Sequence, residues 1–256
     1  MAYDNLDIQI ENYVATVTIN HPPVNSVNLA TIQDIEKAFD ELAENKDVRV
    51  VILTGSGEKA FSAGFDVSDA ANAAKAGEEG QRVWTKIFRY TKPVIAAVNG
   101  FAFGGGCELA MACHFRLMSD APKAKIGLTE LNLGILPGWG GTQRLTVLVG
   151  RTKALELILF SKRLTAEEAF QIGLVEKVCA PDKLMAETRE MAEQLVNRPP
   201  LGVANVLKAV ATGLDWGYDA GLKAELEGSK IVSSSQDAVE GFTAFFEKRD
   251  PAFKGE

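Results

Sequence analysis

Two short segments of this chain combine a glutamate with glycine-rich backbone. The first is Gly104-Gly-Gly-Cys-Glu108, and the second places Glu130 ahead of Pro137-Gly-Trp-Gly-Gly141. Both lead into apolar stretches typical of helices, so each would place a carboxyl group beside free backbone N–H groups at a helix start. Such N–H groups can polarise a carbonyl while the carboxyl group moves a proton.

Each segment also has a simpler interpretation. The glycines could serve only to let a helix pack closely on a sheet, and Glu108 could simply complement the helix dipole. Glu130 could lie at the surface or pair with Arg144. The repetition of the pattern favours chemistry. Two partly desolvated carboxyl groups can divide acid and base roles if their surroundings separate their pKa values.

The elements that must position these glutamates alternate between strands and helices. Residues 6–20 alternate with period two around Glu11-Asn12, which predicts an antiparallel hairpin, and residues 30–44 have helical spacing. Residues 48–54 and 94–98 are short runs of β-forming residues that each follow a helical stretch and lead into a glycine-containing turn. This order predicts an α/β core.

The chain changes character after this core. Beyond Arg144 helical patterns dominate, and Arg198-Pro-Pro200 is the best candidate boundary, which predicts a core over residues 1–198 and a helical region over residues 199–256. A further turn, Ala60-Phe-Ser-Ala-Gly-Phe-Asp66, would open at the carboxyl end of a strand, where ligands of α/β sheets bind.

Composition excludes several classes of function. With a net charge of −7, the 256-residue chain is poorly suited to broad binding of nucleic acid or of an anionic membrane surface, and no apolar run is long enough for a membrane span. Three cysteines in apolar surroundings and an acidic start without a signal peptide favour the cytoplasm. Two histidines and no paired cysteine spacing argue against a His- or Cys-ligated metal site.

Taken together in this order, the motifs resemble the enoyl-CoA hydratase/isomerase, or crotonase, superfamily. The resemblance covers nearly the whole chain, and its most specific parts are Phe61-Ser-Ala-Gly-Phe-Asp66, Lys92-Pro-Val-Ile-Ala-Ala-Val-Asn-Gly100, the Gly104–Glu108 segment and Leu136-Pro-Gly-Trp-Gly-Gly-Thr-Gln-Arg-Leu145. It implies an α/β superhelix of repeated ββα units with a C-terminal helical trimerisation region. The implied assembly is a homotrimer or a dimer of trimers.

The resemblance also implies roles for individual residues. Glu108 and Glu130 match the two catalytic carboxylates of the hydratases, and the N–H groups of Phe65 and Gly105 match the oxyanion hole. Gly138 resembles the residue whose N–H holds the catalytic water. The residues implied in coenzyme A binding are Val24, Ser26, Val27, Ala63, Asp66 and Lys248, the last acting from a neighbouring subunit; those implied in the acyl pocket are Trp139 and Phe245.

The implied ligand is an acyl-CoA thioester, with no cofactor beyond the coenzyme A of the substrate itself. Water addition to a conjugated thioester gathers negative charge on the carbonyl oxygen, which two positioned N–H donors stabilise. Glu108 would act as base on the water, and Glu130 would deliver the proton to Cα. Phe65 and Trp139 are larger than the residues usual at their positions, which leaves the shape of the acyl pocket open.

Two other functions are compatible with these residues. One is a related crotonase-type reaction, such as double-bond isomerisation or hydration of a cyclic or branched acyl-CoA, because function resides in the site and not in the fold. The other is a non-catalytic protein that binds acyl-CoA or RNA. The glutamate pair favours hydration of a 2-enoyl-CoA, and the net charge of −7 argues against RNA binding.

Overall fold

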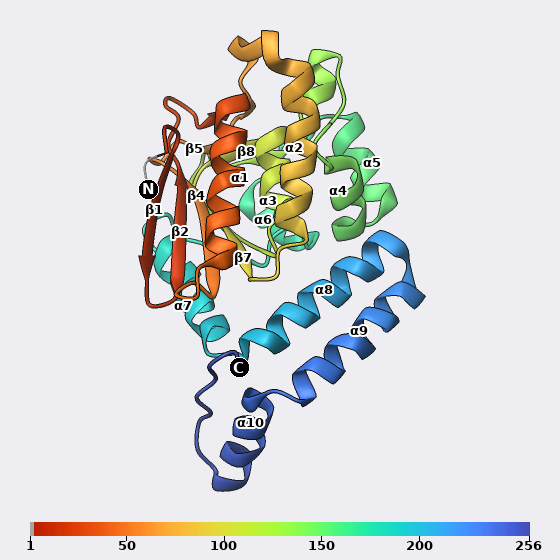
Figure 1. Ribbon diagram of the computed structural model, residues 1–256. Helices are drawn as coiled ribbons and strands as arrows, with labels where there is room; N and C mark the ends of the chain where they lie inside the picture. Colours follow the sequence, from red (N-terminus) through yellow and green to blue (C-terminus); the bar gives the residue numbers. More distant parts are fainter. Residues whose placement is uncertain (1–2) are drawn as a thin grey trace.

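The structure, a computed structural model, describes residues 3–256 and is built around a six-stranded sheet. The strands follow the order β1-β2-β4-β7-β9-β11, and all neighbours are parallel except the predicted β1–β2 hairpin (Figure 1). Their bounds are β1 Leu6–Glu11, β2 Val14–Ile19, β4 Val50–Gly55, β7 Val94–Val98, β9 Phe115–Ser119 and β11 Lys177–Cys179. Parallel neighbours need long connections, and these connections carry the helices and loops of the site.

Each of the four inner strands begins a strand–strand–helix unit. A short second strand leaves the sheet and pairs in a three-stranded sheet of order β10-β8-β5 or in the β3–β6 pair, and a helical segment follows. The second strands are β3 Ser26–Val27, β5 Ala60–Ser62, β6 Gly64–Phe65, β8 Phe101–Phe103 and β10 Ile126–Gly127, and the helical segments are α1 Leu29–Glu44, η1 Val67–Asn72, α2 Ala73–Phe88, α3 Gly105–Ala112, η2 Glu130–Leu133 and α4 Gly141–Val149. This repetition is the ββα architecture that the resemblance implies.

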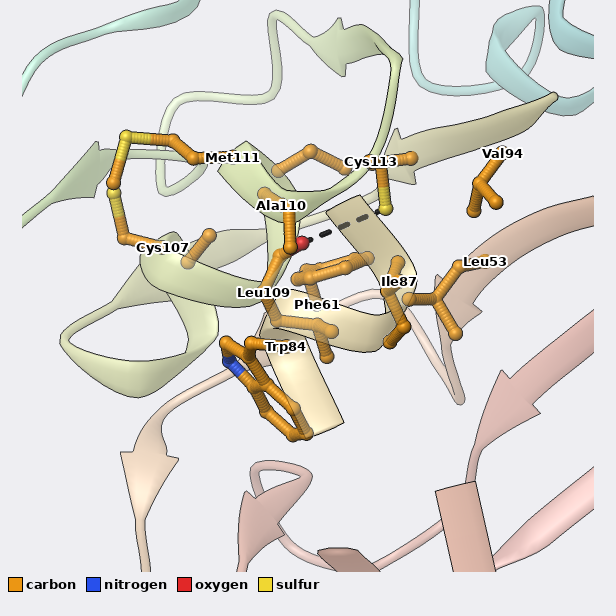
Figure 2. Packing of buried hydrophobic residues seen from close by; sticks show 14 of the residues in the cluster. Leu53, Phe61, Trp84, Ile87, Val94, Cys107, Leu109, Ala110, Met111 and Cys113 are labelled. Atoms are coloured by element: carbon orange, nitrogen blue, oxygen red, sulfur yellow. Dashed lines mark hydrogen bonds between the residues drawn. The ribbon is translucent and has the colours of Figure 1, made fainter. Parts of the chain in front are cut away.

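Both faces of the large sheet are covered. Along β4, Val51 and Leu53 join the apolar cluster that includes residues of α1, α2 and α3, whereas Val50 and Ile52 join the cluster that includes residues of α7 Leu184–Val196. The alternation follows from the two-residue period of a strand. Figure 2 shows part of the first cluster, with Trp84 beside α3. The start of α3 therefore rests on a fully packed core.

The C-terminal part of the chain is mainly helical, as the sequence predicts. Its helices are α5 Arg151–Leu159, α6 Ala166–Gln171, α7, α8 Pro200–Trp216, α9 Tyr218–Ser233 and α10 Gln236–Glu247. In Figure 1, α8 and α9 form an antiparallel pair, and α10 lies farther from the sheet. The final segment returns to the core, where Arg49 donates hydrogen bonds to the carbonyl oxygens of Val196 (3.1 Å) and Phe253 (3.0 Å).

The three last helices expose many large apolar side chains. Between 45 and 78% of the surface of each is accessible, and the set includes Val206, Val210, Leu222, Leu226, Ile231, Val239, Phe242, Phe245 and Phe246. Monomeric proteins seldom leave contiguous apolar patches of this kind open to water. The described chain thus presents a surface suited to burial against protein.

Seven strands are missing from the sequence-based prediction: β3, β5, β6, β8, β9, β10 and β11. Six of them have only two or three residues, too few to show a two-residue period. The longer β9 carries the buried Arg116, whose Nη1 donates to the carbonyl of Cys113 (2.7 Å). A cation inside an apolar run obscures its pattern. None of the helices within residues 3–256 is both long and apolar enough to cross a membrane. The boundary between residues 198 and 199 stays a prediction.

Candidate active site

Glu108 lies on the first turn of α3 and is 2% exposed. Its Oε1 accepts hydrogen bonds from the backbone N–H groups of Trp139 and Gly141, each at 2.7 Å. Its Oε2 has no hydrogen-bond partner within residues 3–256 and remains available to a ligand. Burial raises the pKa of Glu108 to about 7, with a contribution from the negative charge of Glu130, while the two N–H donors oppose this rise.

Glu130 begins the short helix η2 and is 9% exposed. Both of its carboxyl oxygens are buried without a hydrogen-bond partner in the described chain. A Cβ added to Gly104 would lie 3.4 Å from Oε1 of Glu130, which places this carboxyl group beside the start of α3. Burial raises the pKa of Glu130. A buried carboxyl group without a hydrogen-bond partner in the described chain can pair with a ligand or a water molecule, which makes Glu130 a candidate functional residue.

The turn that holds Glu108 is itself held by Arg144. The buried Arg144 donates from Nη1 to the carbonyl of Trp139 (2.6 Å) and from Nη2 to Oγ1 of Thr85 (3.2 Å). At Gly140 the backbone has φ +98°, and a Cβ there would overlap the guanidinium of Arg144. The positive charge of Arg144 also lowers the pKa of Glu108. The suggested Arg144–Glu130 pair is wrong, because Arg144 binds the turn instead.

The two expected oxyanion donors come from adjacent segments. Gly105 is the first residue of α3, where an N–H group has no partner within its helix. A Cβ added to Gly64 would lie 2.8 Å from the nitrogen of Gly105 and 2.6 Å from the carbonyl oxygen of Phe103. The Gly64–Phe65 strand β6 therefore lies directly against the start of α3. A glycine is needed at position 64 for this approach and for its φ of +85°.

The structure brings five of the six residues expected to contact coenzyme A into one strip. The N–H of Ala63 donates to the carbonyl of Val24 (3.1 Å), and that of Asp66 donates to the carbonyl of Val27 (3.0 Å). Ser26 donates from Oγ to Oδ2 of Asp66 (3.1 Å). The strip continues into β6, so it adjoins the expected oxyanion donor in that strand.

Other expected residues occupy different positions. Gly138 is exposed, and its carbonyl accepts a hydrogen bond from the side chain of Gln81 (3.2 Å). The N–H groups that donate to Glu108 are those of Trp139 and Gly141, not that of Gly138. Phe245 and Lys248 lie on or just after α10, away from α3 in the same chain (Figure 1). Their expected roles therefore require a second copy.

Sequence reasoning missed the N–H groups of Trp139 and Gly141 as ligands of Glu108 and the anchoring of the turn by Arg144. Only the glycine density and the nearby arginine signalled this arrangement, because the bonds join residues more than 30 positions apart. Within residues 3–256, no cluster of three or more His, Cys, Asp or Glu side chains is suited to a metal ion.

These groups can carry out proton transfer at a polarised carbonyl. Glu108 has one oxygen fixed by two donors and one free oxygen, and a pKa near neutrality suits a base that works at neutral pH. Burial raises the pKa of Glu130 as well, and its carboxyl oxygens accept no hydrogen bond from the described residues, so they are open to a ligand. The helix start between them offers backbone N–H groups to a developing oxyanion.

Comparisons with known proteins agree with this geometry. Residues 9–256 match the family model described as enoyl-CoA hydratase/isomerase. The chain is 41% identical to a crotonyl-CoA hydratase of Syntrophomonas wolfei, over 99% of both chains, and 39% identical to a carnitinyl-CoA dehydratase of Salmonella arizonae, over 94% of this chain and 95% of the relative. The crystal structure of an enoyl-CoA hydratase from Bacillus anthracis superposes with a TM-score of 0.94 at 37% identity, covering 99% of this chain and all of the other.

Proposed function

Because the chain belongs to the enoyl-CoA hydratase/isomerase family, we propose that it adds water to the double bond of a 2-enoyl-CoA and forms a 3-hydroxyacyl-CoA. The observation that carries this proposal is the contrast between two buried glutamates at the start of α3. Glu108 is held by two N–H donors, whereas Glu130 has no partner within the described residues. The name of the crotonyl-CoA hydratase relative supports the same reaction.

The thioester carbonyl is bound by the N–H groups of Phe65 and Gly105. Oε2 of Glu108 accepts a proton from water as the water oxygen bonds to Cβ, and the electrons of the double bond move toward the carbonyl oxygen. Glu130 gives its proton to Cα, which restores the thioester carbonyl. This leaves Glu108 protonated and Glu130 ionised, and proton exchange with water restores the starting state. The two N–H donors stabilise the enolate by an amount typically worth 10²-fold or more in rate each.

The strip formed by Val24, Ser26, Val27, Ala63 and Asp66 provides the coenzyme A site. The backbone of this strip continues into β6, which carries the proposed oxyanion donor Phe65, and this continuity supports the assignment. Lys248 contributes a positive charge toward the phosphates from a neighbouring copy, and Phe245 of that copy closes the acyl pocket. Gly138 helps to place the water through its N–H.

We also propose a homotrimer or a dimer of trimers, assembled through α8, α9 and α10. The exposed apolar side chains of these helices support this assembly. The cytoplasm is the proposed compartment, and the buried free thiols of Cys107, Cys113 and Cys179 suit its reducing conditions. The steps proposed above consist of hydrogen bonding, proton transfer and formation of the bond between the water oxygen and Cβ, and we propose that they use no cofactor beyond the coenzyme A of the substrate.

A second candidate is a hydration or dehydration that involves a branched or substituted acyl-CoA, which the carnitinyl-CoA dehydratase relative favours. The test is a panel of linear, branched and cyclic enoyl-CoAs, followed by loss of the conjugated absorbance and by mass. Gain of one water by a linear substrate supports the proposal. An isobaric product would identify an isomerase, and no conversion of any linear substrate would refute the proposed function.

A further inference from the structure

The indole ring of Trp139 is wedged between two helices at the active site. Only 5% of the residue is exposed. A Cβ added to Gly80 of α2 would lie 2.5 Å from Cε2 and Nε1 of the ring, and one added to Gly105 of α3 would overlap Cζ3 and Cε3. Real Cβ atoms do not approach so closely, so both positions must lack a side chain for the ring to occupy this space.

Aromatic side chains confine the same ring. Trp84 meets it edge to face, with ring centroids 5.2 Å apart, and Phe65 does so at 6.3 Å. Trp84 is fixed in turn, because its Nε1 donates to the carbonyl of Gly105 (3.0 Å) and its side chain is fully buried. Close-packed interiors yield little, so the indole ring cannot move aside without disturbing Gly80, Gly105 and Trp84 together.

This confined ring adjoins the proposed reaction centre. It contacts Gly105 and Phe65, which carry the proposed oxyanion donors, and the N–H of Trp139 itself holds Glu108. A bound enoyl group would have its carbonyl at those donors and its Cβ near Glu108. Carbons beyond Cβ would then extend toward space that the indole ring fills.

We propose that Trp139, which packs against Gly80, is a specificity-determining residue that restricts the enzyme to short-chain 2-enoyl-CoA substrates. This inference rests on the proposed function and adds its substrate class. A single methylene in an apolar pocket changes discrimination by about 10- to 200-fold, so an eight-carbon substrate should be disfavoured against a four-carbon one by at least about tenfold.

The test measures kcat/KM for linear 2-enoyl-CoAs of four, six, eight and ten carbons. The parent enzyme should prefer four carbons over eight by about tenfold or more. In Trp139→Leu this ratio should fall by about tenfold or more, because the side chain no longer fills the space. Trp139→Phe, which retains an aromatic ring, is the matched control and should keep the parental order of substrates.

Gly80→Ala provides the reciprocal variant. Alone, its methyl group should push the indole toward the reaction centre and lower kcat/KM for the four-carbon substrate. Combined with Trp139→Leu, the same methyl group should refill part of the space and move the chain-length ratio back toward the parental value. Such a reversal is the coupling expected of residues in contact.

The outcomes separate the two proposals. The role of Trp139 would be overturned by equal kcat/KM for four and eight carbons in the parent, or by an unchanged four-to-eight-carbon ratio of kcat/KM in folded Trp139→Leu. Neither result would contradict the proposed hydration. Absence of hydration at every chain length in the parent would instead overturn the proposed function. If circular dichroism shows that Trp139→Leu does not fold, the role of Trp139 is still tested by the dependence of kcat/KM on chain length in the parent and by the Gly80→Ala variant.

Discussion

The burial of Glu108 predicts that Glu108→Gln stabilises the fold above neutral pH while it lowers the hydration rate by about 10²-fold or more. The folded-state pKa of about 7 lies above the ordinary value of 4.5, so the folded protein binds this proton more tightly than the unfolded chain. The corresponding contribution to the free energy of unfolding is fully present below pH 4.5 and is lost as pH rises through about 7. Gln stays neutral, and its carbonyl can still accept the N–H groups of Trp139 and Gly141.

The magnitude follows from the gap between 4.5 and about 7 for a nearly fully buried group. At 1.36 kcal/mol per pKa unit, the gain in the free energy of unfolding at pH 8 is at most about 3 kcal/mol. For a chain of this size that corresponds to a rise in Tm of about 6–12 °C. At pH 4 the difference between Glu108→Gln and the parent should vanish.

The assay is thermal unfolding by circular dichroism at fixed protein concentration, at pH 4, 6 and 8, with hydration measured in parallel. Glu193→Gln, at an exposed position on α7, is the matched control and should change the free energy of unfolding by less than about 0.5 kcal/mol at each pH. A Glu108→Gln variant no more stable than the parent at pH 8 would refute the argument that burial raises this pKa.

Three further predictions concern the turn, the ligand and the assembly. Arg144→Met should lower kcat by about tenfold or more and move the acidic limb of the pH–kcat/KM profile above about 7, because the guanidinium charge lowers the pKa of Glu108. An acidic limb that does not shift would contradict this explanation. The control Arg144→Lys keeps a positive charge and should restore part of kcat. Lys248→Ala should raise KM for acyl-CoA with kcat nearly unchanged, whereas equal KM values would mark Lys248 as a solvated end residue. Light scattering at micromolar concentration should give the mass of a trimer or hexamer, and a monomer mass would argue against the assembly proposed through α8–α10.

Local patterns predicted much of the core. The β1–β2 hairpin, α1, β4 and β7 were predicted within about two residues of their observed bounds, because each carries a clear two-residue or helical period. The position of Glu108 in the first turn of α3 was also predicted from the glycine run before it. These features depend on neighbouring residues only.

Long-range contacts were beyond the reach of such patterns. The hydrogen bonds from Trp139 and Gly141 to Glu108 depend on how α3 and α4 pack. The position of the Trp139 ring depends on Gly80 in α2. A glycine inside a helical pattern can signal close packing, yet nothing local identifies its partner. The assignment of residue roles therefore came from the resemblance, and the structure adds the burial and the hydrogen bonds of those residues.

The central claim is that Glu108 and Glu130 act together on one water and one carbon. Its most direct test is the hydration rate and acyl-CoA affinity of Glu108→Gln, Glu130→Gln and the double variant. Each single change should lower kcat by about 10²-fold or more with binding retained, and the double variant should lose little more than either single one. Near-parental turnover in either single variant, with acyl-CoA still bound, would contradict the two-glutamate mechanism.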